Sequence, residues 1–132
     1  MATPFLVRAA RAEETVHVYN WTDYIGETTL DDFQKATGIK VVYDTYDSTE
    51  SAEAKLLAGK TGYDVVLQSG QTLPRFVEAG VYQKLDKAKL PDWKNLDPDI
   101  LKIVSGWDPG NDYGVPYMWG SVGITYNLDM VK

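Results

Sequence analysis

Aromatic rings, a hydroxyl and a carboxylate gather in the stretch YNWTDYIG, directly after a short run typical of a β-strand. The side chains that could do chemistry here are Trp21, Thr22, Asp23 and Tyr24. Aromatic faces attract cations, and a carboxylate accepts charge-assisted hydrogen bonds from an ammonium group. The stretch therefore suits an ammonium ligand. The alternative is structural: Trp21 and Tyr24 pack in the core, and Asp23 caps the next helix.

A second polar stretch, QSGQT, follows another strand-like run at residues 68–72. Ser69 and Gln71 offer hydrogen-bond donors and acceptors, and the backbone N–H groups at Ser69-Gly70 could meet an anion. The alternative is that Ser69 caps the following helix. The Gly-Lys-Thr at 59–61 has neither the preceding strand nor the glycine spacing of a nucleotide-binding loop. Binding of a ligand to QSGQT therefore does not imply a nucleotide.

Catalytic and metal chemistry have few candidates in this chain. His17 is the single histidine, it lies within a strand-like run, and there is no cysteine. A zinc site would need carboxylates alone, which is unusual. No G-x-S-x-G motif accompanies the histidine, so a serine triad is not indicated. The sequence predicts a binding protein with no metal and no cofactor, not an enzyme.

Composition sets the class of protein and of partner. The 132 residues are 44% hydrophobic and 12% aromatic, with a formal net charge of −6. An acidic balance disfavours nucleic acid and anionic membrane as partners, because both need a basic surface. The length predicts a single domain over residues 14–132. Residues 1–13 contain Ala10-Arg11-Ala12, which has the form of a signal-peptide cleavage site, and we expect a mobile segment there.

Strand and helix patterns alternate from Thr15 onwards. Strands are predicted over residues 15–19, 39–46 and 63–68, and helices over residues 27–37, 49–58 and 72–79. Thr28 with Asp31, and Asp47 with Glu50, resemble N-cap pairs for the first two helices. The alternation predicts an α/β fold of three layers, with a mostly parallel sheet and helices on both faces. The continuous run Val65–Leu67 suits a strand covered on both faces.

The pattern changes after residue 80. Short elements and turns are expected over residues 81–97, a helix begins at Asp97-Pro98, and DPGN at 108–111 forms a turn. Residues 113–127 are expected to form two extended pieces that break near Gly120. Ligands of open parallel sheets bind at the carboxyl ends of the strands. The loops that carry Trp21 and Ser69 are therefore expected to open onto one crevice.

Several segments in order resemble the periplasmic polyamine-binding proteins, the spermidine/putrescine receptors of bacterial ABC importers. They are VHVYNWTDYIGETTLDDFQKATGIKVVYD, AKLLAGKTGYDVVLQSG, LDKAKLPDWKNLDPDIL and YGVPYMWGSVGITYN. The resemblance runs from about residue 15 to residue 132. It implies one lobe, the first, of the two-lobed type II periplasmic binding protein fold, in which the ligand lies between the lobes.

The resemblance also implies roles for residues of the two loops. Trp21 would stack on the methylenes of a polyamine, Asp23 would lie near one terminal amine, and Thr22, Tyr24 and Ser69 would make polar contacts. Gln71 stands where the family varies and would tune ligand choice. The implied partners are a polyamine and a membrane ABC permease, and the implied location is the periplasm.

One lobe supplies only one wall of such a cleft, so we expect weak polyamine binding by this chain. The face that the missing second lobe would cover carries Trp21, Tyr24 and Trp119. Exposed aromatic surface of this kind favours self-association, most simply as a two-fold dimer. Two alternatives stay open. One is an interaction module that self-associates and binds no polyamine, and the other is a flavodoxin-like enzyme, which would need a cofactor.

Overall fold

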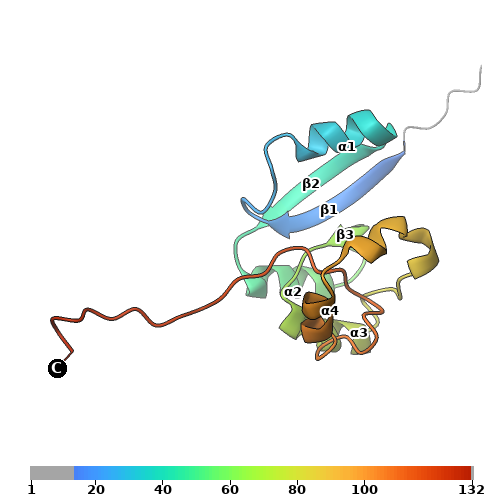
Figure 1. Ribbon diagram of the computed structural model, residues 1–132. Coiled ribbons are helices and arrows are strands. Elements are labelled where there is room, and N and C mark those ends of the chain that lie inside the picture. Colours follow the sequence, from blue (N-terminus) through green and yellow to red (C-terminus); the bar gives the residue numbers. More distant parts are fainter. Residues whose placement is uncertain (1–13, 132) are drawn as a thin grey trace, which may run out of the picture. The chain divides into compact units, whose positions relative to one another are not determined.

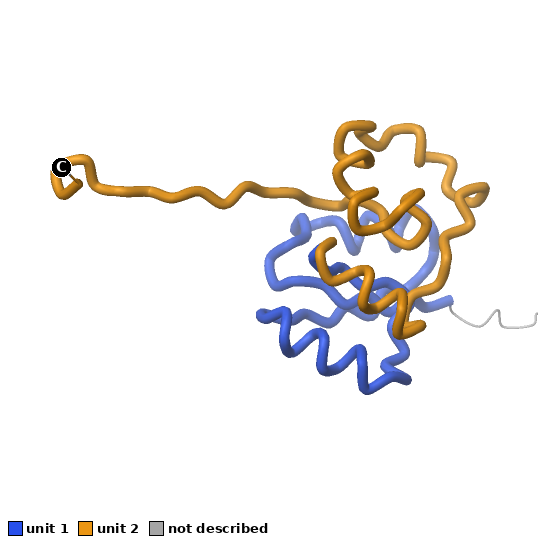
Figure 2. The backbone as a smooth tube through the Cα atoms, turned by 90° about the horizontal axis from the view of Figure 1, so that it is seen from below, with its two compact units in different colours: residues 1–69 blue, residues 70–132 orange. Residues whose placement is uncertain are grey.

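The computed structural model describes residues 14–131, which form two compact units that divide between Ser69 and Gly70 (Figure 2). The segment 1–13, predicted to be mobile, lies outside the described residues. The predicted bounds of a single domain, residues 14–132, stay a prediction.

A three-stranded parallel sheet forms the centre of the first unit. Its strands are β1 (Thr15–Trp21), β2 (Lys40–Tyr46) and β3 (Val65–Val66), in the order β2-β1-β3. Trp21 lies beside Tyr46 at the carboxyl ends of β1 and β2. β-Branched and aromatic residues dominate these strands, as expected for a pleated, partly buried surface. The three predicted parallel strands are confirmed.

The third strand is shorter than predicted. Two backbone hydrogen bonds extend its pairing with β1, from Asp64 N to His17 O and from Leu67 N to Tyr19 O, both 2.9 Å. Val65 is 46% exposed, so the expectation of burial on both faces is wrong for this residue. β3 is an edge strand of this sheet, and an edge strand has a neighbour on one side only.

Helices α1 (Thr29–Thr37) and α2 (Thr49–Leu57) connect the strands and lie on opposite sides of the sheet (Figure 1). The crossover from β1 to β2 and the crossover from β2 to β3 run in opposite directions across the sheet. With both crossovers right-handed, their helices must cover opposite faces. The predicted three-layer α/β arrangement is confirmed. Gly38 ends α1 with φ at 74°, a conformation that glycine adopts without strain.

The helix caps differ from those predicted. Thr28 occupies the N-cap position of α1, but its side chain makes no capping hydrogen bond. At α2 the cap is Ser48, whose Oγ accepts a hydrogen bond from Ser51 N at 3.3 Å, so the predicted Asp47 cap is wrong by one residue. Ser48 has the extended backbone that a cap requires immediately before the first helical turn.

The second unit consists of short helices joined by turns. They are the 3-10 helices η1 (Gly70–Thr72), η2 (Lys87–Lys89) and η3 (Pro91–Asn95), and the α-helices α3 (Leu73–Glu78) and α4 (Pro98–Val104). Phe76 of α3 is fully buried and its ring contacts that of Tyr82, with centroids 5.7 Å apart. Asp97 caps α4 as predicted, accepting from Asp99 N at 2.8 Å.

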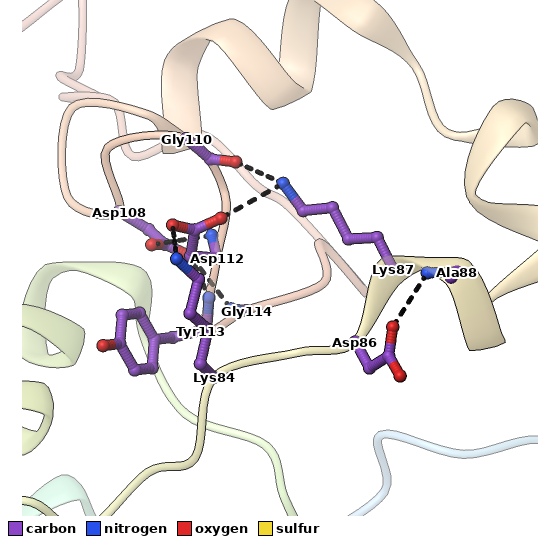
Figure 3. A network of polar contacts seen from close by, with 9 residues as sticks. All are labelled: Lys84, Asp86, Lys87, Ala88, Asp108, Gly110, Asp112, Tyr113 and Gly114. Atoms are coloured by element: carbon purple, nitrogen blue, oxygen red, sulfur yellow. Dashed lines mark hydrogen bonds and ion pairs between the residues drawn. The ribbon is translucent and has the colours of Figure 1, made fainter.

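A buried carboxylate organises the turn after α4 (Figure 3). Asp108 is 1% exposed, and its two oxygens accept from the backbone N–H groups of residues 112, 113 and 114 at 3.0, 2.8 and 2.9 Å. The predicted DPGN turn is confirmed by the hydrogen bond from Asn111 N to Asp108 O at 2.7 Å. The carboxylate of Asp112 meets Lys84 Nζ at 2.9 Å and Lys87 Nζ at 3.4 Å.

The extended pieces predicted over residues 113–127 form no strand. This part of the chain leads away from the rest of the second unit (Figure 2), and Val122 and Ile124 are almost completely exposed. A strand is stabilised by a neighbour that pairs with its backbone, and no strand of residues 14–131 pairs with this segment. The extended pieces therefore do not pair into a sheet, because sequence pattern alone does not supply that neighbour.

Candidate functional site

The chain turns sharply at the carboxyl end of β1, where four of the predicted site residues lie. Thr22 anchors the turn to β2: its N and its Oγ1 both donate to Tyr46 O, at 2.9 and 3.0 Å. Asp23 has φ at 64°, in the left-handed region, and Tyr24 N then donates to Trp21 O at 3.4 Å. Asp is among the residues that tolerate this conformation. The turn therefore presents consecutive side chains at the edge of the sheet.

Asn20 stabilises this turn through the hydrogen bonds of its buried side chain, and sequence reasoning missed it. It is 1% exposed, and its Nδ2 donates to Tyr24 O at 3.0 Å and to Tyr43 Oη at 2.8 Å. Its Oδ1 accepts from Trp21 N at 2.8 Å. Buried amides need such partners. An asparagine at the end of an apolar strand was the available signal, but its partners lie on β2 and on the following turn.

The aromatic rings near the turn form a contiguous group. The ring of Trp21 lies 4.5 Å from that of Tyr46 and 6.3 Å from that of Tyr24, between centroids. Trp21 is half-buried and Tyr24 is 48% exposed. The alternative that both rings belong to the core is therefore wrong for Tyr24. Trp21 packs on Tyr46 on one side and keeps part of its surface accessible.

The carboxylate of Asp23 is available to a ligand. Asp23 is exposed and forms no hydrogen bond or ion pair with any residue from 14 to 131. The alternative was that Asp23 caps the next helix. The N-cap residue of that helix, α1, is Thr28, so this alternative is wrong. A carboxylate beside accessible aromatic surface is the arrangement that binds alkylammonium groups.

Ser69 lies at the same edge of the sheet as this turn. The β1 and β3 strands are parallel, so their carboxyl ends lie at the same edge of the sheet. Tyr46 Oη, at the end of β2, donates to Leu67 O, which directly follows β3. Ser69 follows two residues later and is half-buried. Gln71 is exposed on η1, in the second unit. The structure thus brings Trp21–Tyr24 and Ser69 to one edge, and the roles of all these residues in ligand binding stay predictions.

Two cavities of the second unit have other linings. One of about 260 Å³ lies between α3 and residues 107–113, and one of about 220 Å³ lies beside η3; no predicted site residue lines either. In the described part of the chain, no three His, Cys, Asp or Glu side chains are placed to hold a metal ion. Within residues 14–131, no helix has the length and apolar character needed to cross a membrane.

Comparison with known proteins shows close relatives over nearly the whole chain. The chain is 59% identical over 123 residues to the putrescine-binding periplasmic protein SpuD of Pseudomonas aeruginosa. The aligned residues make up 93% of this chain and 34% of that protein. It is 45% identical over 126 residues to the spermidine/putrescine-binding periplasmic protein of Escherichia coli. Here the aligned residues make up 93% of this chain and 36% of that protein. The chain thus spans about a third of the length of these relatives.

Solved structures agree with this relationship. The spermidine/putrescine ABC transporter substrate-binding protein PotD of Streptococcus pneumoniae superposes with a TM-score of 0.77 at 34% identity, over 82% of this chain and 33% of that one. The TpPotD lipoprotein of Treponema pallidum superposes with a TM-score of 0.74 at 31% sequence identity. The match covers 80% of this chain and 33% of that one. The predicted lobe of a type II periplasmic binding protein is confirmed. Residues 28–132 match the family described as bacterial extracellular solute-binding protein, and the chain belongs to that family.

Proposed function

We propose that this chain forms one wall of the solute pocket of a periplasmic polyamine-binding protein that serves a membrane ABC permease. The names of its relatives support putrescine or spermidine as the solute. The observation that carries the proposal is the carboxylate of Asp23, which has no partner among residues 14–131, beside the accessible rings of Trp21 and Tyr24.

The chemistry of a polyamine matches this surface. Each ammonium end needs acceptors, and the apolar methylenes between them need an aromatic face. Thr22 Oγ1 donates its proton to Tyr46 O, so the hydroxyl offers only lone pairs to a ligand. Asp23 and Thr22 would thus both accept from one ammonium end, and Trp21 would cover the methylenes. Ser69 adds a hydroxyl at the same edge.

This chain supplies one wall of the proposed pocket, whereas a diamine needs acceptors at both of its charged ends. Binding by this chain alone is therefore expected to be weak, with a dissociation constant of roughly millimolar order. A test of polyamine binding must therefore detect weak, saturable binding and show at which residue it occurs. In ¹H–¹⁵N NMR spectra, the indole N–H of Trp21 can be assigned by its loss in Trp21→Phe.

Putrescine should shift the Trp21 indole signal along a saturable curve in the full 132-residue chain. Asp23→Asn should remove most of that shift, because the ammonium end loses its charged acceptor. Asp31→Asn is the matched control, since it removes the same charge from an exposed position on α1. A Trp21 signal that does not respond to putrescine would refute the proposal, and so would equal losses in the two variants.

A second candidate function is self-association through exposed apolar surface. Trp119, Val122, Ile124 and Tyr126 are all exposed, and the last three alternate along the chain as on one face of a strand. Apolar surface of this kind favours association with another copy, most simply as a two-fold dimer. Self-association does not require polyamine binding, so the two candidates are independent.

Light scattering tests this candidate over a range of protein concentrations. The unmodified chain should have twice the monomer mass, and Val122→Lys with Ile124→Lys should reduce it to that of a monomer. Ser121→Lys with Thr125→Lys adds the same charge at the alternate positions and should leave the dimer largely intact. A monomeric mass for the unmodified chain at high concentration would exclude this candidate.

A further inference from the structure

Tyr46 connects the carboxyl ends of the three strands of the sheet. It is the last residue of β2, and its backbone O accepts two hydrogen bonds from Thr22, which directly follows β1. Its hydroxyl donates to the O atom of Leu67, which directly follows β3. Because β1 lies between β2 and β3, the side chain of Tyr46 must cross the end of β1 to make this bond.

The ring of Tyr46 packs between two aromatic rings of β1. Tyr19 and Trp21 are two positions apart on this strand, so their side chains point to the same face of the sheet. Their ring centroids lie 4.8 and 4.5 Å from that of Tyr46. Tyr46 is 5% exposed and Tyr19 is 4% exposed. The indole of Trp21 therefore packs on a buried ring whose far end is held by a hydrogen bond.

The orientation of the Trp21 indole depends on this packing. The indole N–H forms no hydrogen bond with any residue from 14 to 131, so ring contacts decide how the indole lies. Its other ring neighbour is Tyr24, which is 48% exposed and whose centroid is 6.3 Å away. The nearer and buried ring of Tyr46 therefore restricts the indole more than that of Tyr24 does.

We infer that Tyr46 is a positioning residue for Trp21, whose indole it holds in the orientation that covers the methylenes of a polyamine. This inference rests on the proposed function for the role of Trp21. The packing of the two rings does not, and it can be measured without any solute. Tyr46 acts through the indole, and the proposal does not require it to touch the ligand.

The test measures the mobility of the Trp21 indole N–H in the full chain by its ¹H–¹⁵N heteronuclear nuclear Overhauser effect. Tyr46→Leu should lower this value, because the indole loses the flat ring on which it packs. Tyr46→Phe keeps that ring and should leave the value close to that of the unmodified chain. Tyr46→Met, whose flexible side chain fills irregular space, should lower the value as Tyr46→Leu does, and it decides the test if Tyr46→Leu does not fold.

Tyr63→Leu is the matched control, since the ring of Tyr63 also packs on Tyr19, with centroids 4.6 Å apart. In the described chain, Tyr63 has no ring contact or hydrogen bond with residues 21–24, so its loss should leave the Trp21 value unchanged. Equal lowering by Tyr63→Leu and Tyr46→Leu would overturn the inference whether or not a polyamine binds. So would a value in Tyr46→Phe as low as in Tyr46→Leu, or no lowering in Tyr46→Leu and Tyr46→Met.

A solute arm connects this packing to binding. Tyr46→Leu should raise the dissociation constant for putrescine roughly threefold, the effect of one weakened aromatic contact. Tyr46→Phe and Tyr63→Leu should leave it unchanged. An unchanged constant in Tyr46→Leu, with a more mobile indole, would overturn the role of Tyr46 in binding. A Trp21 signal that does not respond to putrescine in the unmodified chain would instead refute the proposed function, and the mobility comparison would still decide the packing.

Discussion

Asp23 is distinguished from the other acidic residues by its backbone. Its left-handed conformation turns the chain at the end of β1 and leaves the carboxylate exposed without a partner in the described chain. Asp108 is the opposite case, a buried carboxylate with three backbone donors. Residue type could not separate the two in the sequence, because their environments depend on which N–H groups the fold brings near them.

Asp112 allows a prediction about pH. The hydrogen bond from Lys84, and secondarily that from Lys87, hold the pKa of the Asp112 carboxyl below its ordinary value of 3.8. A lowered pKa means that the folded state favours the ionised form. Its stabilising contribution is therefore present above pH 3.8 and is lost as the pH falls through the lower pKa of the folded state.

Lys84→Met should raise the pKa of Asp112, as measured from its carboxyl ¹³C shift during an acid titration. Lys94→Met, on η3, removes the same charge and should change that pKa much less. The difference between the two variants should shrink in high salt, because Lys84 is exposed and Asp112 is only half-buried. Equal changes would mean that net charge, and not this ion pair, sets the pKa.

Helices and strands were predictable where the local pattern is strong. The strands of β-branched and aromatic residues and the glycine-terminated helix α1 appear close to their expected bounds. The cap of α2 was not predictable to the residue, because Asp47 and Ser48 are both good N-cap types and adjacent. Residues 113–127 have a strand-like composition but pair with no strand, and pairing is decided by distant parts of the chain.

The cap of α2 gives a prediction about stability. Ser48→Ala should lower the free energy of unfolding by about 1 kcal/mol, because Ser51 N loses its side-chain acceptor. Asp47→Ala should cost clearly less, since Asp47 is exposed and does not cap the helix. Urea unfolding followed by circular dichroism would compare them. A larger loss for Asp47→Ala would show that the helix begins one residue earlier in solution.

For the molecule as a whole, the alternation of strands and helices was enough to predict a parallel α/β lobe, and the solved relatives confirm it. Parallel topology also explains why two loops distant in sequence, after β1 and β3, meet at one edge. The preferred solute could not be predicted, since recognition of a dication needs acceptors at both ends and this chain supplies one wall of the proposed pocket.

The central claim is that the turn at Trp21–Tyr24 binds a polyamine. The most direct measurement is of intermolecular nuclear Overhauser effects between the methylene protons of spermidine and the aromatic protons of the chain. The account predicts cross-peaks to the indole of Trp21 and the ring of Tyr24 that disappear in Asp23→Asn. Cross-peaks that instead reach Trp93, Trp107 or Tyr113, at the cavities of the second unit, would contradict it.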